Sequence, residues 1–308
     1  MSPASAEQVA RRAGLEPRVA LDWLCACAAT GYVRYEADAE TFELTPAARV
    51  LFADEDDPRC LLSMIQAVKS VFDDEERATR AVREGRRLAW GERSPGCFCG
   101  TDRAFGPAYA KRHVSDFLPA MDGVAERPAA GGLAGDVGCG QGSALRALVR
   151  AFPRSRFRGF DMHPRLIEVA RERAAAAGLE IVSFEVADAG DLPLAGFDLL
   201  CVFDALHDMG DPEGAVARTR RALTPTGRLM VLQARAGDRP EDNLHLTGAI
   251  YYSLSTRACV LASKAEPVGL ALGAQAGPGA LEQVLRAGGF DQVRRIAATP
   301  TKLVLEAC

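Results

Sequence analysis

From about residue 131 onward the sequence alternates between short apolar segments and amphipathic ones, and this alternation constrains the fold more than any other feature. The order is LAGDVG, SALRALVRAF, RFRGFD, PRLIEVARERAAAAG, IVSFEVAD, FDLLCVFDAL, PEGAVARTRRAL and GRLMVLQAR. Strands that alternate with helices indicate a parallel sheet covered by helices on both faces. The last residues, ALEQVLRAGGFDQVRRIAATPTKLVLEAC, add a helix and two strands separated by a Thr-Pro-Thr turn. We therefore predict an α/β domain over residues 131–308.

Residues 5–52 have a different pattern, which predicts a winged helix-turn-helix. A first helix begins after the capping Ser5 and ends at Gly14, and a second begins near Pro17. The segment YVRYEADAETFELT then has the alternation of a β-hairpin. Residues 1–50 carry five arginines and seven acidic residues, the opposite of what a phosphate-binding surface requires. We therefore expect a homodimerisation domain and no nucleic-acid partner.

The length of the chain predicts more than one domain. With 308 residues, about half of them apolar, it can bury two modest cores. We expect a winged-helix and dimerisation domain at 1–90, a linker and covering helix at 91–130, and the α/β domain at 131–308. Residues 91–107, GERSPGCFCGTDRAFGP, are rich in Gly and Pro and predict a loop that serves as linker or lid.

Charge, hydropathy and cysteine usage predict a soluble cytoplasmic protein. The formal net charge of −4 is small and no basic block is present. No apolar run is long enough to span a membrane, and the start, MSPASAEQVARRAGL, lacks the apolar core of a signal peptide. The nine cysteines are scattered, which favours reduced thiols. We expect no membrane partner.

Three glycines, Gly138, Gly140 and Gly142, follow the first strand of the α/β domain and open a helix. Open α/β sheets bind ligands at this position. A dinucleotide fingerprint needs a glycine where Ser143 stands, and a phosphate-binding P-loop needs a lysine that is absent. The sequence therefore favours neither a dinucleotide site nor a P-loop phosphate site. Asp136, just ahead of the turn, can accept a hydrogen bond from an ammonium group.

Two further carboxylates end the next two strands. Asp161 comes nineteen residues after Gly142, where a carboxylate can bind both hydroxyls of a ribose. Asp188 ends the following strand, where it can meet an adenine amino group. An amine, a diol and an adenine in this order describe S-adenosylmethionine. A nicotinamide-dependent oxidoreductase is an alternative only if the glycine turn binds a dinucleotide after all.

On these motifs, residues 131–235 resemble the class I S-adenosylmethionine-dependent methyltransferases, whose D-x-G-x-G-x-G motif is similar to DVGCGQG here. The resemblance implies a Rossmann-like, seven-stranded sheet whose last strand is antiparallel. It also implies S-adenosylmethionine as the cofactor, held by the glycine turn and by the ends of the following strands. The residues concerned are Asp136, Gly138, Cys139, Gly140, Gly142, Asp161, Met162, Asp188, Ala189, Phe203 and Asp204.

His207 and Asp208 follow the fourth strand of this domain, in FDALHDMGD. This pair resembles the small-molecule O-methyltransferases of the caffeate and hydroxyindole type, which also carry an N-terminal winged-helix dimerisation domain. The resemblance implies that His207 is a catalytic base for a hydroxyl, with Asp208 beside it. In that family a Glu at the end of the fifth strand supports the His, whereas Gln233 stands there in this chain. A neutral amide orients an imidazole but does not stabilise an imidazolium as a carboxylate does.

The sequence leaves the methyl acceptor open. We predict O-methylation of a small molecule, with S- or N-methylation of a small thiol or amine as one alternative. A winged-helix regulator that senses S-adenosylmethionine is another. Thiols and amines are partly nucleophilic near neutral pH, so they need less help from a base. The expected substrate-binding residues are Tyr109 and His113, ahead of the sheet, and His245 and Tyr252, in a predicted helix after the fifth strand.

The cysteine spacing predicts no metal site. Cys97 and Cys99 form a Cys-x-Cys pair, but the only second pair is Cys25 and Cys27, in a predicted helix where side chains two residues apart diverge. Cys139, inside the glycine turn, is interpreted as a small packing residue rather than as a nucleophile.

Overall fold

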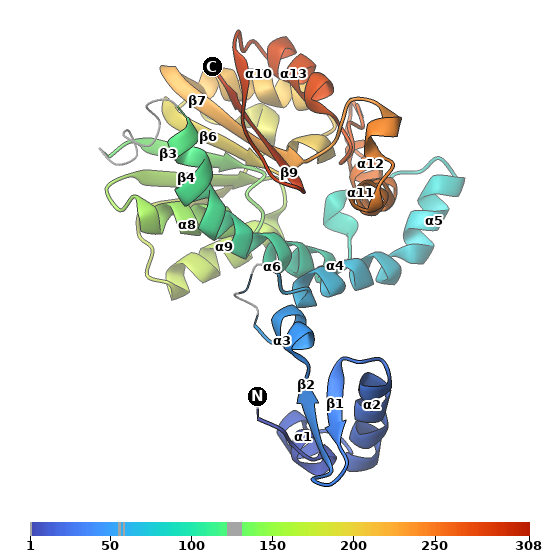
Figure 1. The fold of residues 1–308 in the computed structure, drawn as a ribbon. Helices are drawn as coiled ribbons and strands as arrows, with labels where there is room; N and C mark the ends of the chain where they lie inside the picture. The colour runs from blue at the N-terminus through green and yellow to red at the C-terminus, as the bar shows by residue number, and fades with distance from the viewer. Residues whose placement is uncertain (1, 55–56, 58, 122–130) are drawn as a thin grey trace. The chain divides into compact units, whose positions relative to one another are not determined.

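The computed structural model describes residues 2–54, 57, 59–121 and 131–308, and it divides into two compact units, residues 1–65 and residues 66–308 (Figure 1). This division lies earlier than residue 90, where the sequence pattern places it, and the three segments expected from the sequence remain a prediction. Among the described residues, no helix combines the length and the hydropathy needed to cross a membrane.

The first unit has the elements of a winged helix-turn-helix. They are α1 (Ala6–Ala13), α2 (Pro17–Ala29), β1 (Val33–Glu36), β2 (Thr41–Leu44) and α3 (Pro46–Phe52). Ser5 caps the start of α1, and Gly14 ends it at a φ of 66°, in the left-handed region that favours glycine. The two strands pair antiparallel, as the hairpin pattern predicts. A small core of Leu24, Val33 and Phe42 joins α2 to the hairpin.

The second unit is built on a seven-stranded sheet with the order β5-β4-β3-β6-β7-β9-β8 (Figure 1). Its strands are β3 (Leu133–Val137), β4 (Arg156–Asp161), β5 (Val182–Val186), β6 (Phe197–Phe203), β7 (Leu223–Ala234), β8 (Val293–Ala298) and β9 (Lys302–Ala307). The strands from β3 to β7 run parallel, and β9 pairs antiparallel with both β7 and β8. The expected sheet with an antiparallel last strand is therefore confirmed.

Helices cover both faces of this sheet because its central strands are apolar on both sides. On β6, Leu199, Cys201 and Phe203 belong to one buried cluster, and Leu200 and Val202 belong to the other. The first cluster includes residues of α8 and α9, and the second includes residues of α10 and α13. The bounds of these helices are α8 (Ser143–Ala151), α9 (Pro164–Ala176), α10 (Pro212–Ala222) and α13 (Pro278–Ala287).

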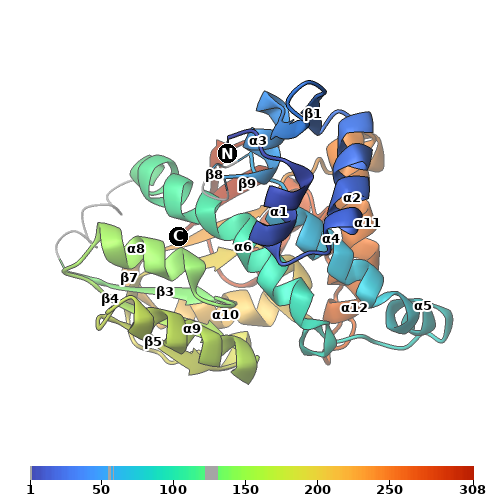
Figure 2. The ribbon, with the colours of Figure 1, turned by 90° about the horizontal axis from the view of Figure 1, so that it is seen from below.

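Residues 91–107 are mainly helical, so the predicted loop is wrong. They lie largely within α6 (Pro95–Arg112), which runs alongside α8 (Figure 2). The glycines that suggested a loop are required by close packing. A Cβ at Gly100 would lie 2.5 Å from the backbone nitrogen of Ala67, and one at Gly106 would lie 3.1 Å from Ser143 Cβ. Pattern rules count such glycines as helix breakers because they see no neighbouring element.

Short helices complete the second unit around its sheet. Ahead of the sheet are α4 (Leu62–Asp73), which begins in the first unit, α5 (Glu75–Arg83), η1 (Trp90–Glu92), η2 (His113–Phe117) and η3 (Leu118–Ala120). Within and after it are η4 (Ala189–Asp191), η5 (Leu206–Asp208), η6 (Pro240–Asn243), α11 (Leu246–Arg257) and α12 (Cys259–Ser263). The helix predicted after the fifth strand is confirmed by α11.

Candidate active site

The glycine turn between β3 and α8 keeps the backbone free of side chains where the sheet ends. Gly138, Gly140 and Gly142 have φ values of 74°, 54° and 76°, all in the left-handed region. A Cβ at Gly138 would lie 2.5 Å from Ala205 Cβ, and one at Gly142 would lie 2.7 Å from the Phe184 ring. A Cβ at Gly140 would meet no atom within 4 Å. Close packing thus requires glycine at positions 138 and 142, whereas Gly140 presents bare backbone to open space.

Asp161, the last residue of β4, holds this turn in place. Its Oδ2 accepts a hydrogen bond from Gly140 N at 2.9 Å, and its Oδ1 accepts one from His163 N at 2.9 Å. Burial raises the pKa of the Asp161 carboxyl, and the two backbone hydrogen bonds oppose this rise. Because each carboxylate oxygen has two lone pairs, Asp161 keeps acceptor capacity beyond these two bonds.

A cavity of about 470 Å³ opens at the carboxyl ends of β3, β4, β5 and β6. It brings together most of the residues expected to bind cofactor, together with one of the two expected catalytic residues and one of the four expected substrate residues. These lining residues are Asp136, Gly138, Cys139, Gly140, Asp161, Met162, Asp188, Ala189, Phe203, Asp204, Asp208 and Tyr109. The cavity therefore lies where open α/β sheets bind ligands.

Asp136 is the most deeply buried carboxylate on the cavity wall, at 1% exposure. Its Oδ1 has no hydrogen-bond partner among the described residues. Burial raises the pKa of Asp136 well above its usual range, and the nearby charge of Asp161 adds to the effect. A buried acceptor without a donor costs free energy, and a cationic donor in the cavity would relieve that cost.

Asp188 lies at another part of the wall, after β5. It caps η4, with Oδ1 accepting from Gly190 N at 2.7 Å, and Oδ2 is not used by that cap. Glu266, which the sequence analysis does not single out, lines the same cavity. Its Oε2 accepts from Gly210 N at 2.6 Å, and burial raises the pKa of this carboxyl. No motif in the sequence marks Glu266, because it reaches the site through a long insertion after β7.

Asp204 carries a polar network at the end of β6. Tyr109 Oη donates to Asp204 Oδ2 at 2.7 Å, and Lys302 Nζ forms an ion pair with the same oxygen. The Lys302 ammonium also lies 4.2 Å from the centre of the Phe105 ring. Asp204 has a φ of 51°, which is uncommon for a residue other than glycine. This network ties α6 to β6 and β9 beside the cavity.

The wall nearest α6 is aromatic. Trp90, Phe98, Phe105, Tyr109 and Phe203 all line the cavity, and Tyr109 stacks on Phe203 with ring centres 5.8 Å apart. Trp90 and Phe98 are not among the residues predicted from the sequence. The signal was present, since Phe98, Phe105 and Tyr109 are spaced by seven and then four residues, as on one face of a helix.

His207 is buried behind Asp208 and is not among the residues that line the cavity. Its Nδ1 is hydrogen-bonded to Gln233 Oε1, and its Nε2 lies 3.4 Å from Asp208 Oδ1. Gln233 Nε2 has no hydrogen-bond partner among the described residues. Asp208 lines the cavity, and burial raises the pKa of its carboxyl while His207 lowers it. Gln233 therefore orients the imidazole, as its position in the sequence suggests.

Gly142, His245 and Tyr252 do not line the cavity. Gly142 packs against Phe184. His245 caps α11, with its Nδ1 accepting from Gly248 N at 3.1 Å, and Tyr252 is partly exposed on the same helix. Neither lines the cavity. The side chain of His113 lies outside the described part of the chain.

Two family models match this chain. Residues 135–270 match the model described as a methyltransferase domain, and residues 1–52 match an Rv2258c-like winged HTH domain. Nocamycin O-methyltransferase of Saccharothrix syringae is 30% identical over 173 residues, which cover 52% of this chain and 60% of that enzyme. Demethylmenaquinone methyltransferase of Thermus thermophilus is 35% identical over 100 residues, 32% of this chain and 45% of that enzyme. The alignments thus span less than two thirds of these relatives.

Solved structures share the fold over nearly the whole chain. PigF with SAH has a TM-score of 0.72 and 18% identity, and the match covers 99% of this chain and 89% of that one. Human N-acetylserotonin methyltransferase in complex with SAM has a TM-score of 0.70 and 18% identity, and the match covers 99% of this chain and 87% of that one. At these identities the likeness concerns the fold alone.

The buried charge of Asp136 gives a prediction about stability. A carboxyl whose pKa is raised by folding stabilises the fold below its unfolded pKa, and this contribution is lost as pH rises. We expect Asp136→Asn to raise the melting temperature of the ligand-free protein at pH 7, and to do so much less near pH 4, the usual range of an aspartate. Thermal melts across this range, with the exposed Asp188→Asn as control, measure the difference. An Asp136→Asn effect that does not vary with pH would contradict the interpretation.

Proposed function

We propose that this chain, which matches a methyltransferase domain and a winged HTH domain, transfers the methyl group of S-adenosylmethionine to a small-molecule acceptor. The observation that carries the proposal is one cavity lined by Asp136, Asp161 and Asp188, which lie at the carboxyl ends of three neighbouring strands, around the bare backbone of Gly140. The sequence predicts these residues for an amine, a ribose and an adenine.

The residues present fit this cofactor. Asp136 Oδ1 is buried without a donor, so it suits the ammonium of the methionine part. Gly140 leaves room for a ligand against the backbone, and Asp161 and Asp188 each retain acceptor capacity for hydroxyl or amino hydrogens. When bound, S-adenosylmethionine supplies a methyl group on a sulfonium that is already a good leaving group.

We propose that the acceptor is small and aromatic. The aromatic wall of Trp90, Phe98, Phe105, Tyr109 and Phe203 offers stacking surfaces beside the cofactor residues. Alignment in a dry cavity supplies much of the rate of an in-line displacement. The O-methyltransferase name of the Saccharothrix syringae relative supports a hydroxyl as the acceptor. S- or N-methylation of a thiol or amine remains the alternative.

For a hydroxyl acceptor, we propose that His207 and Asp208 accept the proton. Gln233 Oε1 holds Nδ1, so the proton of a neutral ring sits on Nδ1 and Nε2 keeps its lone pair. Asp208 presents a carboxylate to the cavity beside this nitrogen, at 3.4 Å. An acceptor hydroxyl bonded to Asp208 would pass its proton to this carboxylate and imidazole pair as the methyl group transfers.

We further propose a cytoplasmic homodimer. All nine cysteines are free, which suits a reducing compartment. On α2, Val19 and Trp23 are 61% and 57% exposed, one helical turn apart. Large apolar side chains grouped on a surface are typical of an interface, and a second copy of this acidic, winged-helix unit is the partner that the composition favours. A regulator that senses the cofactor would instead need a DNA-binding surface.

The first test is cofactor binding. Asp161→Ala should weaken S-adenosylmethionine binding by about 2 to 4 kcal/mol, or about 30- to 700-fold, because buried charge-assisted hydrogen bonds are lost. Asp161 also fixes Gly140, so Asp161→Asn, which keeps one acceptor oxygen, should lose less. Titration calorimetry with S-adenosylmethionine and with its demethylated product measures both variants. A wild-type chain that releases no heat with either ligand would refute the proposed cofactor.

The second test is the oligomeric state. Light scattering of the full chain at micromolar concentration should give a dimer, and Val19→Glu with Trp23→Glu should give a monomer because charges disrupt an apolar interface. Arg34→Glu, an exposed charge reversal on the hairpin of the same unit, is the control and should leave the dimer intact. A monomeric wild-type protein under these conditions would count against the dimer.

The third test concerns the base. If the acceptor is a phenol, His207→Ala should lower turnover by about 10² to 10⁴, the usual contribution of a positioned base. Gln233→Glu should speed phenol methylation, since a carboxylate stabilises the imidazolium that forms. With thiols the loss in His207→Ala should be much smaller. Rates over a panel of phenols and thiols decide between these cases, and full activity of His207→Ala on every accepted substrate would remove His207 from the mechanism.

A further inference from the structure

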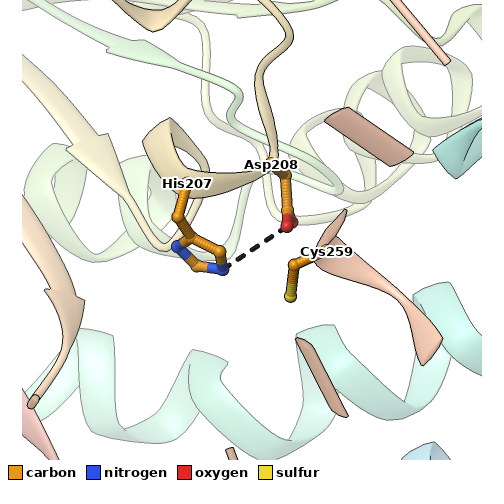
Figure 3. Close-up of side chains that lie close together, drawn as sticks. All are labelled: His207, Asp208 and Cys259. Carbon is orange, nitrogen blue, oxygen red and sulfur yellow. Dashed lines mark ion pairs between the residues drawn. The ribbon is translucent and has the colours of Figure 1, made fainter. Parts of the chain in front are cut away.

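Three side chains that can ligate a metal ion meet beside the cavity, although they come from separate parts of the chain. His207 and Asp208 belong to η5, and Cys259 begins α12 (Figure 3). One ligand atom from each, an imidazole nitrogen, a carboxylate oxygen and the thiol sulfur, lies within 4.8 Å of the other two. His207 and Cys259 are buried, at 6% and 8% exposure.

An imidazole nitrogen and a carboxylate oxygen lie close together at the centre of this cluster. Gln233 Oε1 is an acceptor, so in a neutral His207 ring the proton sits on Nδ1 and Nε2 keeps its lone pair. That lone pair faces Asp208 Oδ1 at 3.4 Å, and Oδ1 is buried without a hydrogen-bond partner among the described residues. With the ring neutral, the nitrogen and the carboxylate oxygen are both acceptors, and a cation between them would be attracted to both.

The protein's own cation near the cluster is engaged elsewhere. Arg93 lies within electrostatic range of Asp208 and Cys259. Its guanidinium, however, donates to the carbonyl oxygens of Arg257 and Ala258, and it pairs with the buried Asp74 at 4.0 Å. Asp74 is thus the carboxylate with which Arg93 forms an ion pair. The direct neighbours of the Asp208 carboxylate are therefore His207 and Cys259, the other two members of the cluster.

We propose that His207 Nε2, Asp208 Oδ1 and Cys259 Sγ bind one divalent transition-metal ion of the zinc class. Nitrogen, oxygen and sulfur ligands in one small site suit Zn²⁺ and Co²⁺ better than Mg²⁺ or Ca²⁺, which prefer oxygen. Gln233 already supplies the second-shell hydrogen bond that fixes a ligating imidazole. Three protein ligands leave a fourth position, and Asp208 opens onto the cavity.

Binding is a ligand exchange in which charge and protons balance. The Cys259 thiol loses its proton to the solvent as the sulfur–metal bond forms, so the thiolate, the Asp208 carboxylate and the divalent ion sum to zero charge. No electron is transferred. The neutral set fits a buried position better than a carboxylate alone.

The site has a regulatory consequence that rests on the proposed function. A metal ion on Nε2 occupies the lone pair that His207 uses as a base. Zn²⁺ would therefore inhibit O-methylation without competing for the cofactor residues at Asp136 and Asp161. The metal binding itself does not depend on that function.

Cobalt gives a direct test, because a thiolate bound to Co²⁺ has a charge-transfer absorption in the near ultraviolet and tetrahedral Co²⁺ absorbs in the visible. The full chain, stripped with a chelator and kept reduced, is titrated with Co²⁺. We expect one equivalent to bind with both absorptions, and Zn²⁺ to displace it. Cys259→Ser should lose the charge-transfer band, and Gln233→Leu should weaken binding about 10- to 100-fold, as for other second-shell partners.

The controls separate this site from other thiols and from loss of the fold. Cys308→Ser removes a partly exposed thiol from the C-terminus and should keep the full spectrum. If Cys259→Ser fails to fold, Asp208→Asn takes its place. This variant changes one carboxylate oxygen to an amide nitrogen and should weaken Co²⁺ binding at least tenfold. Thermal melts and S-adenosylmethionine calorimetry on the same samples report the fold and the cofactor site separately. A wild-type protein with no thiolate band, or a band that survives in Cys259→Ser, would overturn the proposal.

Discussion

The hydrogen bonds from Gly140 N and His163 N to the Asp161 carboxylate are the interactions on which the candidate site depends. They join the turn after β3 to the end of β4, so one side chain fixes where two strands present their backbone. With Asp161 in this role, Gly140 is free to approach a ligand and Asp136 stays behind it, buried and without a donor. The cavity thus combines a fixed glycine turn with a buried carboxylate that lacks a hydrogen-bond donor, and a cationic ligand would supply one.

The sequence was sufficient for the sheet and for much of the cavity floor because both depend on local pattern. Strand and helix periods, the glycine turn and the carboxylates at strand ends are all readable within short windows. Local pattern predicts a loop where α6 forms. Its glycines suggested a helix breaker, whereas Gly100 is needed because the backbone of Ala67 comes close. Local pattern also could not find Glu266 or Lys302, which reach the cavity and its edge from distant segments without any local signal.

The residues predicted to bind the methyl acceptor also show that local sequence pattern does not determine long-range packing. His245 and Tyr252 lie in the insertion after β7, where substrate walls are often found, yet His245 caps α11, Tyr252 lies within it, and neither lines the cavity. The aromatic wall comes instead from η1 and α6, with Trp90 and Phe98. Which of two helical segments covers a site is decided by how each packs, and α6 is held there by Tyr109 on Asp204. Residue type alone carries no such information.

An amide at Gln233, where a carboxylate is expected, changes what the neighbouring His207 can do. A carboxylate there would favour the imidazolium of His207, a form with no free lone pair, and would bring a second negative charge close to Asp208. Gln233 holds the same ring nitrogen without adding a charge, so in a neutral ring Nε2 keeps its lone pair beside Asp208 and Cys259. The nitrogen that can take a proton from an acceptor is then the same one that can ligate a metal ion, and the two uses exclude each other.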